Sequence, residues 1–195
     1  MRPKRDRQET DYQGGMRSAV RGLWSGETDW YTSVDWMAAE IERSFTRAWA
    51  DGLSQCGIRF DEQTPDEAAR LRIEIANEIQ YVYTFADAII NNSKVNGGKL
   101  RTLYDRVDMW TNRYNSIRDL AMSYACQDQK LEWVYGLTEH CSDCRRLNGR
   151  IYRASAWRNA DLYPRKRSLE CKGFRCACEF VPTNKPATPG FPPRI

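Results

Sequence analysis

Apolar side chains recur at intervals of three and four residues along three long stretches of the chain, a spacing typical of helices that bury one face. The first stretch begins near Thr32, and its apolar positions are Val34, Met37, Ile41, Phe45, Ala48 and Trp49. Gly52 follows this stripe, and we expect it to end the helix in a left-handed conformation. Cys56 and Ile58 then fall in a connecting loop.

The second stretch opens on a sequence that is typical of a helix start. Thr64 offers a hydroxyl at the cap, Pro65 occupies the first helical position, and Glu67 stands three residues after the cap. The apolar positions that follow are Ala68, Leu71, Ile75, Ile79, Val82, Ala86 and Ile89. We expect this helix to stop before residues 96–98, which read Asn-Gly-Gly.

The third stretch has the most regular spacing, with alternating steps of three and four residues as in a coiled-coil heptad. Its apolar positions are Leu100, Leu103, Val107, Trp110, Tyr114, Ile117, Ala121 and Tyr124. Two interpretations fit this pattern. We favour a long helix packed on its two neighbours, and the alternative is a seam shared with another subunit.

The pattern changes on either side of these helices. Residues 1–27 mix basic, glycine and polar residues with little periodicity, which favours an extended basic arm. After Gln129, alternation of apolar and polar residues predicts short strands near 131–135, 150–152 and 179–181. Residues 182–195 hold five prolines and predict an extended tail that can dock onto a neighbouring surface.

These elements predict a mainly α protein in four regions. We expect an extended basic arm over 1–27, an elongated helical body of about three long helices over 28–128, a small cysteine-rich β module over 129–181 that resembles a zinc knuckle, and an extended proline-rich tail over 182–195. No run of eighteen apolar residues occurs, and the N-terminus lacks the apolar region of a signal peptide. We therefore expect a protein that contacts no membrane and stays in the cytosol, where thiols remain reduced.

Five of the seven cysteines and the only histidine lie in one short window, between residues 140 and 178. The C-x2-C pair Cys141 and Cys144 can aim two sulfurs at one tetrahedral ion from a tight turn. We expect Cys171 and Cys176 to supply the other two ligands. Cys178 is an alternate ligand, because we expect it to point away from Cys176.

The number of candidate ligands predicts a single zinc ion. One zinc needs four ligands and two independent zincs normally need about eight, whereas the window offers six. Adjacent residues rarely bind the same ion, so we expect His140 to lie behind the ligands or at the surface. A site closed by thiolates leaves no position for water, which favours a structural ion over a catalytic one. Disulfides and unliganded thiols remain as alternatives.

The same window is strongly basic. Residues 141–178 contain ten basic and three acidic side chains, a net charge of +7, so the remainder of a chain of net charge +4 is mildly acidic. This asymmetry predicts contact with a polyanion or an acidic protein surface, and the alternative is a solvated basic face. The candidate contact residues are Arg145, Arg146, Arg150, Arg153, Arg165, Lys166 and Arg167.

The order of residues around the cysteines carries a family resemblance. Trp133, the C-x2-C turn, Leu147 and Gly149 follow one another, and the Cys176–Cys178 pair leads into Pro182. This order resembles the C-terminal module of phage head-morphogenesis proteins, the Mu F-like and SPP1-type minor capsid proteins of tailed phages. The family has a late histidine before its C-x-C pair; here that histidine is missing and Cys171 stands nearby. The resemblance covers roughly residues 107–182.

The resemblance implies a virion component rather than an enzyme. Proteins of this family lie in the head near the portal or the inner capsid surface, and they act in head assembly, DNA packaging or DNA delivery. The partners implied are the portal or major capsid protein, and packaged DNA through the basic module, with several copies per particle. The implied location is the virion head, and the host cytoplasm during assembly.

The sequence also bears on two other classes of function. A single histidine leaves no convincing catalytic dyad, and no phosphate-binding, dinucleotide-binding or HExxH motif occurs, which argues against an enzyme. A zinc-ribbon regulator that binds nucleic acid is the alternative. Its aromatic residues could stack on bases or form the small core of the module; they are Tyr152, Trp157, Tyr163 and Phe174.

Overall fold

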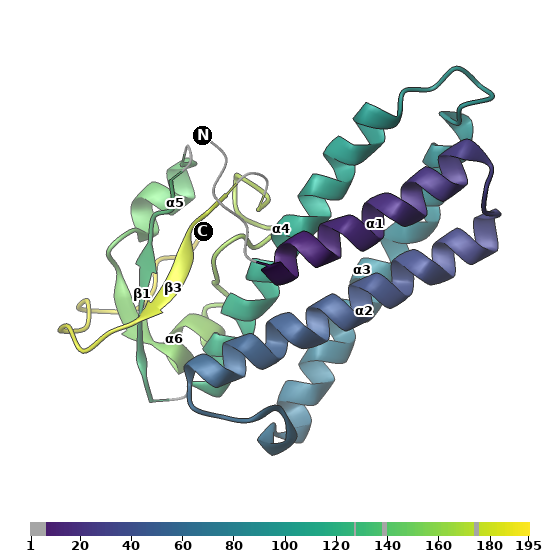
Figure 1. The fold of residues 1–195 in the computed structure, drawn as a ribbon. Helices are drawn as coiled ribbons and strands as arrows, with labels where there is room; N and C mark the ends of the chain where they lie inside the picture. The colour runs from purple at the N-terminus through teal and green to yellow at the C-terminus, as the bar shows by residue number, and fades with distance from the viewer. Residues whose placement is uncertain (1–6, 127, 138–139, 174–175) are drawn as a thin grey trace. The chain divides into compact units, whose positions relative to one another are not determined.

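The protein is mainly helical and ends in a small sheet (Figure 1). The structure, a computed structural model, describes residues 7–126, 128–137, 140–173 and 176–195. The helices are α1 (Arg7–Ser25), α2 (Trp30–Gln55), the 3-10 helix η1 (Phe60–Glu62), α3 (Pro65–Asn91), α4 (Leu100–Ala125), α5 (Ser142–Leu147) and α6 (Ala154–Asn159). The strands are β1 (Lys130–Val134), β2 (Ile151–Arg153) and β3 (Glu179–Pro182). The predicted class, a helical body with a C-terminal β module, is confirmed.

The described residues form two compact units. The bundle unit contains residues 7–46 and 70–111, and the module unit contains residues 47–69 and 112–195. The boundary between them falls inside α2, α3 and α4, so each unit holds a part of each of these helices. This division differs from the predicted regions because side chains of α4 bind the module, Arg118 to Glu179 and Asp119 to Arg165.

In the bundle unit, the predicted N-terminal arm is instead a helix. α1 buries one face at the spacing of an amphipathic helix, through Tyr12, Met16, Ala19, Val20 and Leu23. The expectation of an extended arm is therefore wrong for residues 7–25. The stripe is difficult to see in the sequence because α1 contains three glycines and five charged residues.

Glutamates occupy part of the buried face of α3 in the bundle unit. Glu74 and Glu78 are buried, while the neighbouring Ile75 and Ile79 of the predicted stripe are only half-buried. Glu74 accepts a hydrogen bond from Arg70 one turn earlier, at 2.6 Å. Burying a carboxylate that is paired in this way costs less free energy than burying an unpaired one. A prediction based on hydrophobicity alone therefore placed this part of the buried face of α3 one residue away from its observed position.

The start of α3, which belongs to the module unit, is as predicted. The Glu67 amide donates to Thr64 Oγ1 (3.3 Å), and the Thr64 amide donates to Glu67 Oε2 (2.7 Å). These reciprocal bonds form a capping box, with Pro65 as the first helical residue.

The end of α2 differs from its prediction. Gly52 lies inside the helix, where a Cβ would collide with the Arg118 carbonyl oxygen and the Ala121 side chain of α4. Its role is therefore close helix packing. The left-handed residue that ends α2 is Gly57, with φ of +73°, and the Ile58 amide closes the turn on the Leu53 carbonyl (3.1 Å).

A disulfide joins Cys56 and Cys126, the residues that follow the ends of α2 and α4. Their Cα atoms lie 5.1 Å apart, in the usual range for a disulfide. The expectation that thiols stay reduced therefore does not hold for this pair.

The regular seam of α4 is buried by the chain itself. Leu103, Val107 and Trp110 are buried in the bundle unit, and Tyr114, Ile117 and Ala121 are buried in the module unit. These positions support the interpretation of an ordinary long helix, and they leave no exposed seam along these residues for another subunit.

The three strands lie where the sequence predicts them. They form an antiparallel sheet in the order β2-β1-β3, with Leu131 opposite Tyr152 and Trp133 opposite Phe180. Trp133, Trp157 and Phe180 pack with ring centroids 5.3–5.8 Å apart and form the small core of the module.

The tail after β3 docks on its own module. The Thr188 amide donates to the Ile151 carbonyl (2.8 Å), and the Ile151 amide donates to Thr188 Oγ1 (2.9 Å). The Tyr152 hydroxyl donates to the Phe191 carbonyl at 3.1 Å. The extended tail was predicted, and the surface on which it docks is the outer edge of β2.

Candidate metal centre

The first two cysteines of the cluster lie at the start of α5. Cys141 is the cap residue of this short helix, and its sulfur accepts a hydrogen bond from the Cys144 amide at 3.4 Å. This turn directs both sulfurs to one side. Glu170 Oε2 accepts from the Ser142 amide (2.7 Å) and thereby ties the turn to the loop that carries Cys171.

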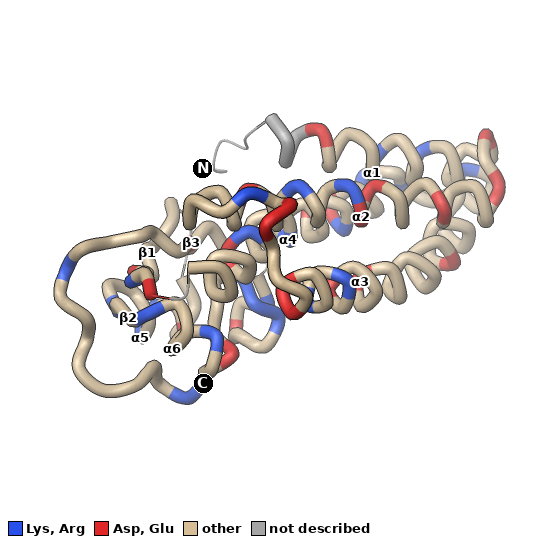
Figure 2. The backbone as a smooth tube through the Cα atoms, turned by 90° about the horizontal axis from the view of Figure 1, so that it is seen from below, with Lys and Arg blue, Asp and Glu red and all other residues tan. Residues whose placement is uncertain are grey.

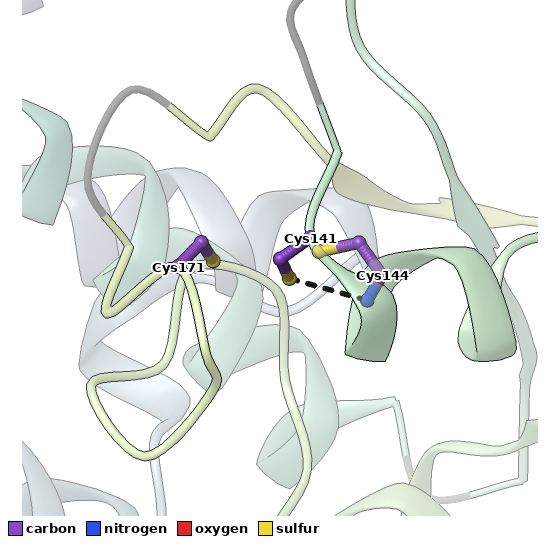
Figure 3. Close-up of side chains that lie close together, drawn as sticks. All are labelled: Cys141, Cys144 and Cys171. Atoms are coloured by element: carbon purple, nitrogen blue, oxygen red, sulfur yellow. Dashed lines mark hydrogen bonds between the residues drawn. The ribbon is translucent and has the colours of Figure 1, made fainter.

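Cys171 reaches the turn from that loop. Figure 3 shows its sulfur pointing into the space in front of Cys141 and Cys144. The loop depends on Gly173, which has φ of +71° and lies so close to the Arg165 carbonyl that a Cβ would collide with it. The sulfurs of Cys141, Cys144 and Cys171 all lie within 4.8 Å of one another.

The last two cysteines belong to the segment that leads into β3. Their sulfurs form a second group with Cys144, in which all three atoms lie within 4.8 Å of one another and all three residues are buried. The Cys144 and Cys176 sulfurs are 3.9 Å apart. Cys144 is thus common to two groups of three.

This arrangement corrects one expectation. Cys178 was expected to point away from Cys176, but both sulfurs approach Cys144. Residues two apart in an extended chain lie on the same side, so the C-x-C spacing itself favours this result. Of the four predicted ligands, Cys141, Cys144 and Cys171 form one group, while Cys176 is grouped with Cys144 and Cys178.

His140 also lies at the cluster. Its Nδ1 atom is 3.8 Å from the Cys178 sulfur, and its ring stacks on Tyr135 with centroids 3.7 Å apart and an angle of 6° between the rings. The stacking fixes the plane of the imidazole. The histidine is half-buried, and its ring nitrogen faces the second group rather than open solvent.

A buried ion pair positions the second group. Arg165 donates to Asp119 on α4 (2.9 Å) and, through Nε, to the Cys176 carbonyl (3.0 Å). Burial raises the pKa of Asp119, and the nearby guanidinium groups of Arg118 and Arg165 oppose that shift. Sequence reasoning missed this pair, because the partners are 46 residues apart and neither stands in a motif.

The electrostatics of the cluster favour thiolate at its buried end. Contact with Cys144, then with Cys176, lowers the pKa of Cys178 to about 3, and the Gly136 amide and the Trp133 indole contribute. Hydrogen bonds with the neighbouring sulfurs raise the pKa of Cys144, because it keeps its proton while its partners ionise. The buried Trp133 indole nitrogen forms no hydrogen bond of regular geometry with the described residues. It lies beside Cys178, so its N–H can donate to a thiolate there.

Most of the basic residues proposed for polyanion contact are already engaged. Arg165 is buried in its ion pair and cannot reach a polyanion, which corrects that assignment. Lys166 pairs with Asp161, and Arg153 lies 3.6 Å from Asp128. The others contact carbonyls or are exposed: Arg145 donates to His140, Arg146 to Arg194, Arg150 to Arg146, and Arg167 is exposed.

Basic positions are mixed with acidic ones along the chain, and the described aromatic residues proposed for base stacking are buried. In Figure 2, Lys and Arg positions are interspersed with Asp and Glu positions along the helices. Tyr152, Trp157 and Tyr163 are buried and belong to the core of the module, while Phe174 lies outside the described residues. The core interpretation of these aromatics is therefore confirmed for the three that the structure describes.

Comparisons with known proteins assign no family. No protein-family model, no curated protein and no solved structure matches the chain. Among the described helices, none is both long and apolar enough to cross a bilayer. What the chain does show is a cysteine cluster near its C-terminus that could hold a metal ion.

Proposed function

We propose that the chain is a structural protein of a phage head whose C-terminal module is closed by zinc. The observation that carries the proposal is the convergence of five cysteines from three separate segments of the module: the α5 turn, the loop at Cys171 and the approach to β3. The proposal that it acts in a phage head rests on the residue order from Trp133 to Pro182, which resembles the minor capsid proteins of tailed phages.

Zinc is the ion that best fits this donor set. Thiolate sulfur with one imidazole suits zinc, which accepts tetrahedral geometry without redox chemistry. The module has three strands of three to five residues and two short helices, so its own core is small. A metal that binds only the folded module stabilises it by its binding free energy.

A structural role fits the surroundings of the cluster. Hydrogen bonds to the backbone, such as the one from Arg165 to the Cys176 carbonyl, hold the loops that carry the ligands. Such contacts fit a site that stabilises the fold better than one that admits a substrate. In this proposal the module is a rigid part that holds the protein against the portal or the inner capsid wall. Copies of the protein would take part in head assembly and in DNA packaging or delivery.

The head assignment is tested by isolating the heads of the phage that encodes the chain. We expect the protein to co-sediment with assembled heads or portals, in several copies per particle. Tight binding of the purified protein to a defined duplex, together with its absence from particles, would instead support the zinc-ribbon regulator. The buried Arg165 and the buried aromatics argue against that alternative.

The zinc assignment has its own test. Cys141→Ser should release metal and unfold the module while the long helices persist, because metal binding and folding are coupled there. Zinc content by elemental analysis, far-ultraviolet circular dichroism and protease resistance of residues 129–195 report these effects separately. Retained metal and a protease-resistant module would show that Cys141 is not a ligand.

A further inference from the structure

The cluster offers more ligands than one ion can take, and their grouping suggests how they are used. Cys141, Cys144 and Cys171 lie around one point, and Cys144, Cys176 and Cys178 lie around another. A single tetrahedral ion would leave one cysteine and His140 without a role. Two groups that share a vertex are the arrangement expected when a thiolate bridges two ions.

The count of ligand positions supports two ions. Two tetrahedral ions need eight positions, and six side chains fill eight positions when two thiolates bridge. Cys144 belongs to both groups, so it can bridge. The Cys176 sulfur lies 3.9 Å from the Cys144 sulfur, close enough for both to contact the same two ions, so Cys176 is the second candidate for a bridge.

We propose that the module holds a two-zinc cluster in which Cys144 and Cys176 bridge the ions. Cys141 and Cys171 complete the first ion, and Cys178 and His140 complete the second. The assignment gives the adjacent residues 140 and 141 to different ions, which removes the steric objection to His140 as a ligand. This inference rests on the proposed zinc module and extends it.

Charge balance also favours the second ion. Five thiolates around two divalent ions leave a net charge of −1, whereas four thiolates around one ion leave −2. A smaller net charge is less costly to bury. Arg165 donates to the Cys176 carbonyl, but its guanidinium group also pairs with Asp119 and so does not offset the charge of the thiolates.

The decisive measurement is the metal content of the full-length protein. Protein reduced and loaded with zinc under anaerobic conditions, then desalted, should carry about two ions per chain by native mass spectrometry. Cobalt titration should show thiolate charge-transfer bands that saturate at about two equivalents. Cadmium-loaded protein should give two cadmium resonances that are coupled to each other through a bridging sulfur.

Variants assign the ions. Cys178→Ser should retain about one ion, whereas Cys144→Ser, which removes a ligand of both ions, should lose both. The matched control is the double variant Cys56→Ser with Cys126→Ser, because it removes the two cysteines outside the cluster that reduction would expose. The control should keep about two ions.

The outcomes separate the two proposals. About one ion in the wild-type chain would overturn the two-ion cluster and leave the structural zinc in place. Less than about half an ion would overturn the zinc module itself. Two uncoupled cadmium resonances would overturn the bridging role of Cys144 and Cys176. The wild-type measurements do not depend on the folding of any variant, so each result either supports or overturns the two-ion cluster.

Discussion

At the scale of single residues, Arg165 is a buried arginine whose backbone is in the left-handed region. Its φ of +61° is unusual for a side chain of this size, and its guanidinium group reaches both Asp119 and the Cys176 carbonyl. The Ser116 hydroxyl donates to the Arg165 carbonyl at 3.3 Å. One buried residue thus holds α4 and the second cysteine group together.

We predict that Arg165→Met destabilises the protein by about 2–3 kcal/mol, because the buried Asp119 would lose one of its two guanidinium partners and keep Arg118. Urea unfolding followed by circular dichroism measures the change. Arg150→Met is the matched control, since Arg150 is exposed and its guanidinium group lies 3.5 Å from the Arg146 carbonyl. Equal stability of the two variants would contradict the role given to Arg165.

A second residue-scale prediction concerns Asp29, which caps α2. Hydrogen bonds from the amide and hydroxyl of Thr32 lower the pKa of Asp29 from its ordinary value of 3.8. A lowered folded pKa means that the cap stabilises fully above the ordinary value and weakens as pH falls through the folded value. Asp29→Asn keeps a capping oxygen, so its stability should lack this acid dependence. Unfolding curves between neutral and strongly acidic pH test the difference.

At the scale of elements, the first turn of α3 was readable from sequence because its signal is local. Thr64, Pro65 and Glu67 act on atoms within three residues. We predict that Thr64→Ala costs about 1 kcal/mol, the usual effect of removing such a cap. Thr84→Ala, which lies on the exposed face of the same helix, should cost little. Chemical unfolding of both variants gives the comparison.

The elements that sequence reasoning missed depend on distant partners. The face of α1 is recognisable only once the other helices supply a surface for Tyr12 and Met16. Gly52 has the appearance of a helix terminator, yet its function is set by Arg118 and Ala121 on another helix. The strands and the C-x2-C turn were predicted because alternation and short spacing are local properties. The sharing of Cys144 between two groups depends on three segments meeting, which no local pattern reveals.

At the scale of the whole molecule, the Cys56–Cys126 disulfide closes a loop across 70 residues of sequence. In the chain-entropy account, a link of this length stabilises by about 4 kcal/mol. We predict that Cys56→Ala with Cys126→Ala lowers the urea midpoint accordingly and leaves the metal content unchanged. Loss of metal in that variant would mean that the helix ends and the cysteine cluster are coupled.

The docked tail has a consequence for how the protein behaves among copies of itself. A strand at the end of a sheet presents unpaired amides and carbonyls that can recruit another chain. Thr188 satisfies both backbone groups of Ile151, so the tail caps the outer edge of β2 as a built-in cover. Proteolysis before residue 188 would uncover this edge and make the module prone to aggregation through strand pairing. An intact tail therefore keeps the protein from aggregating, in addition to stabilising β2.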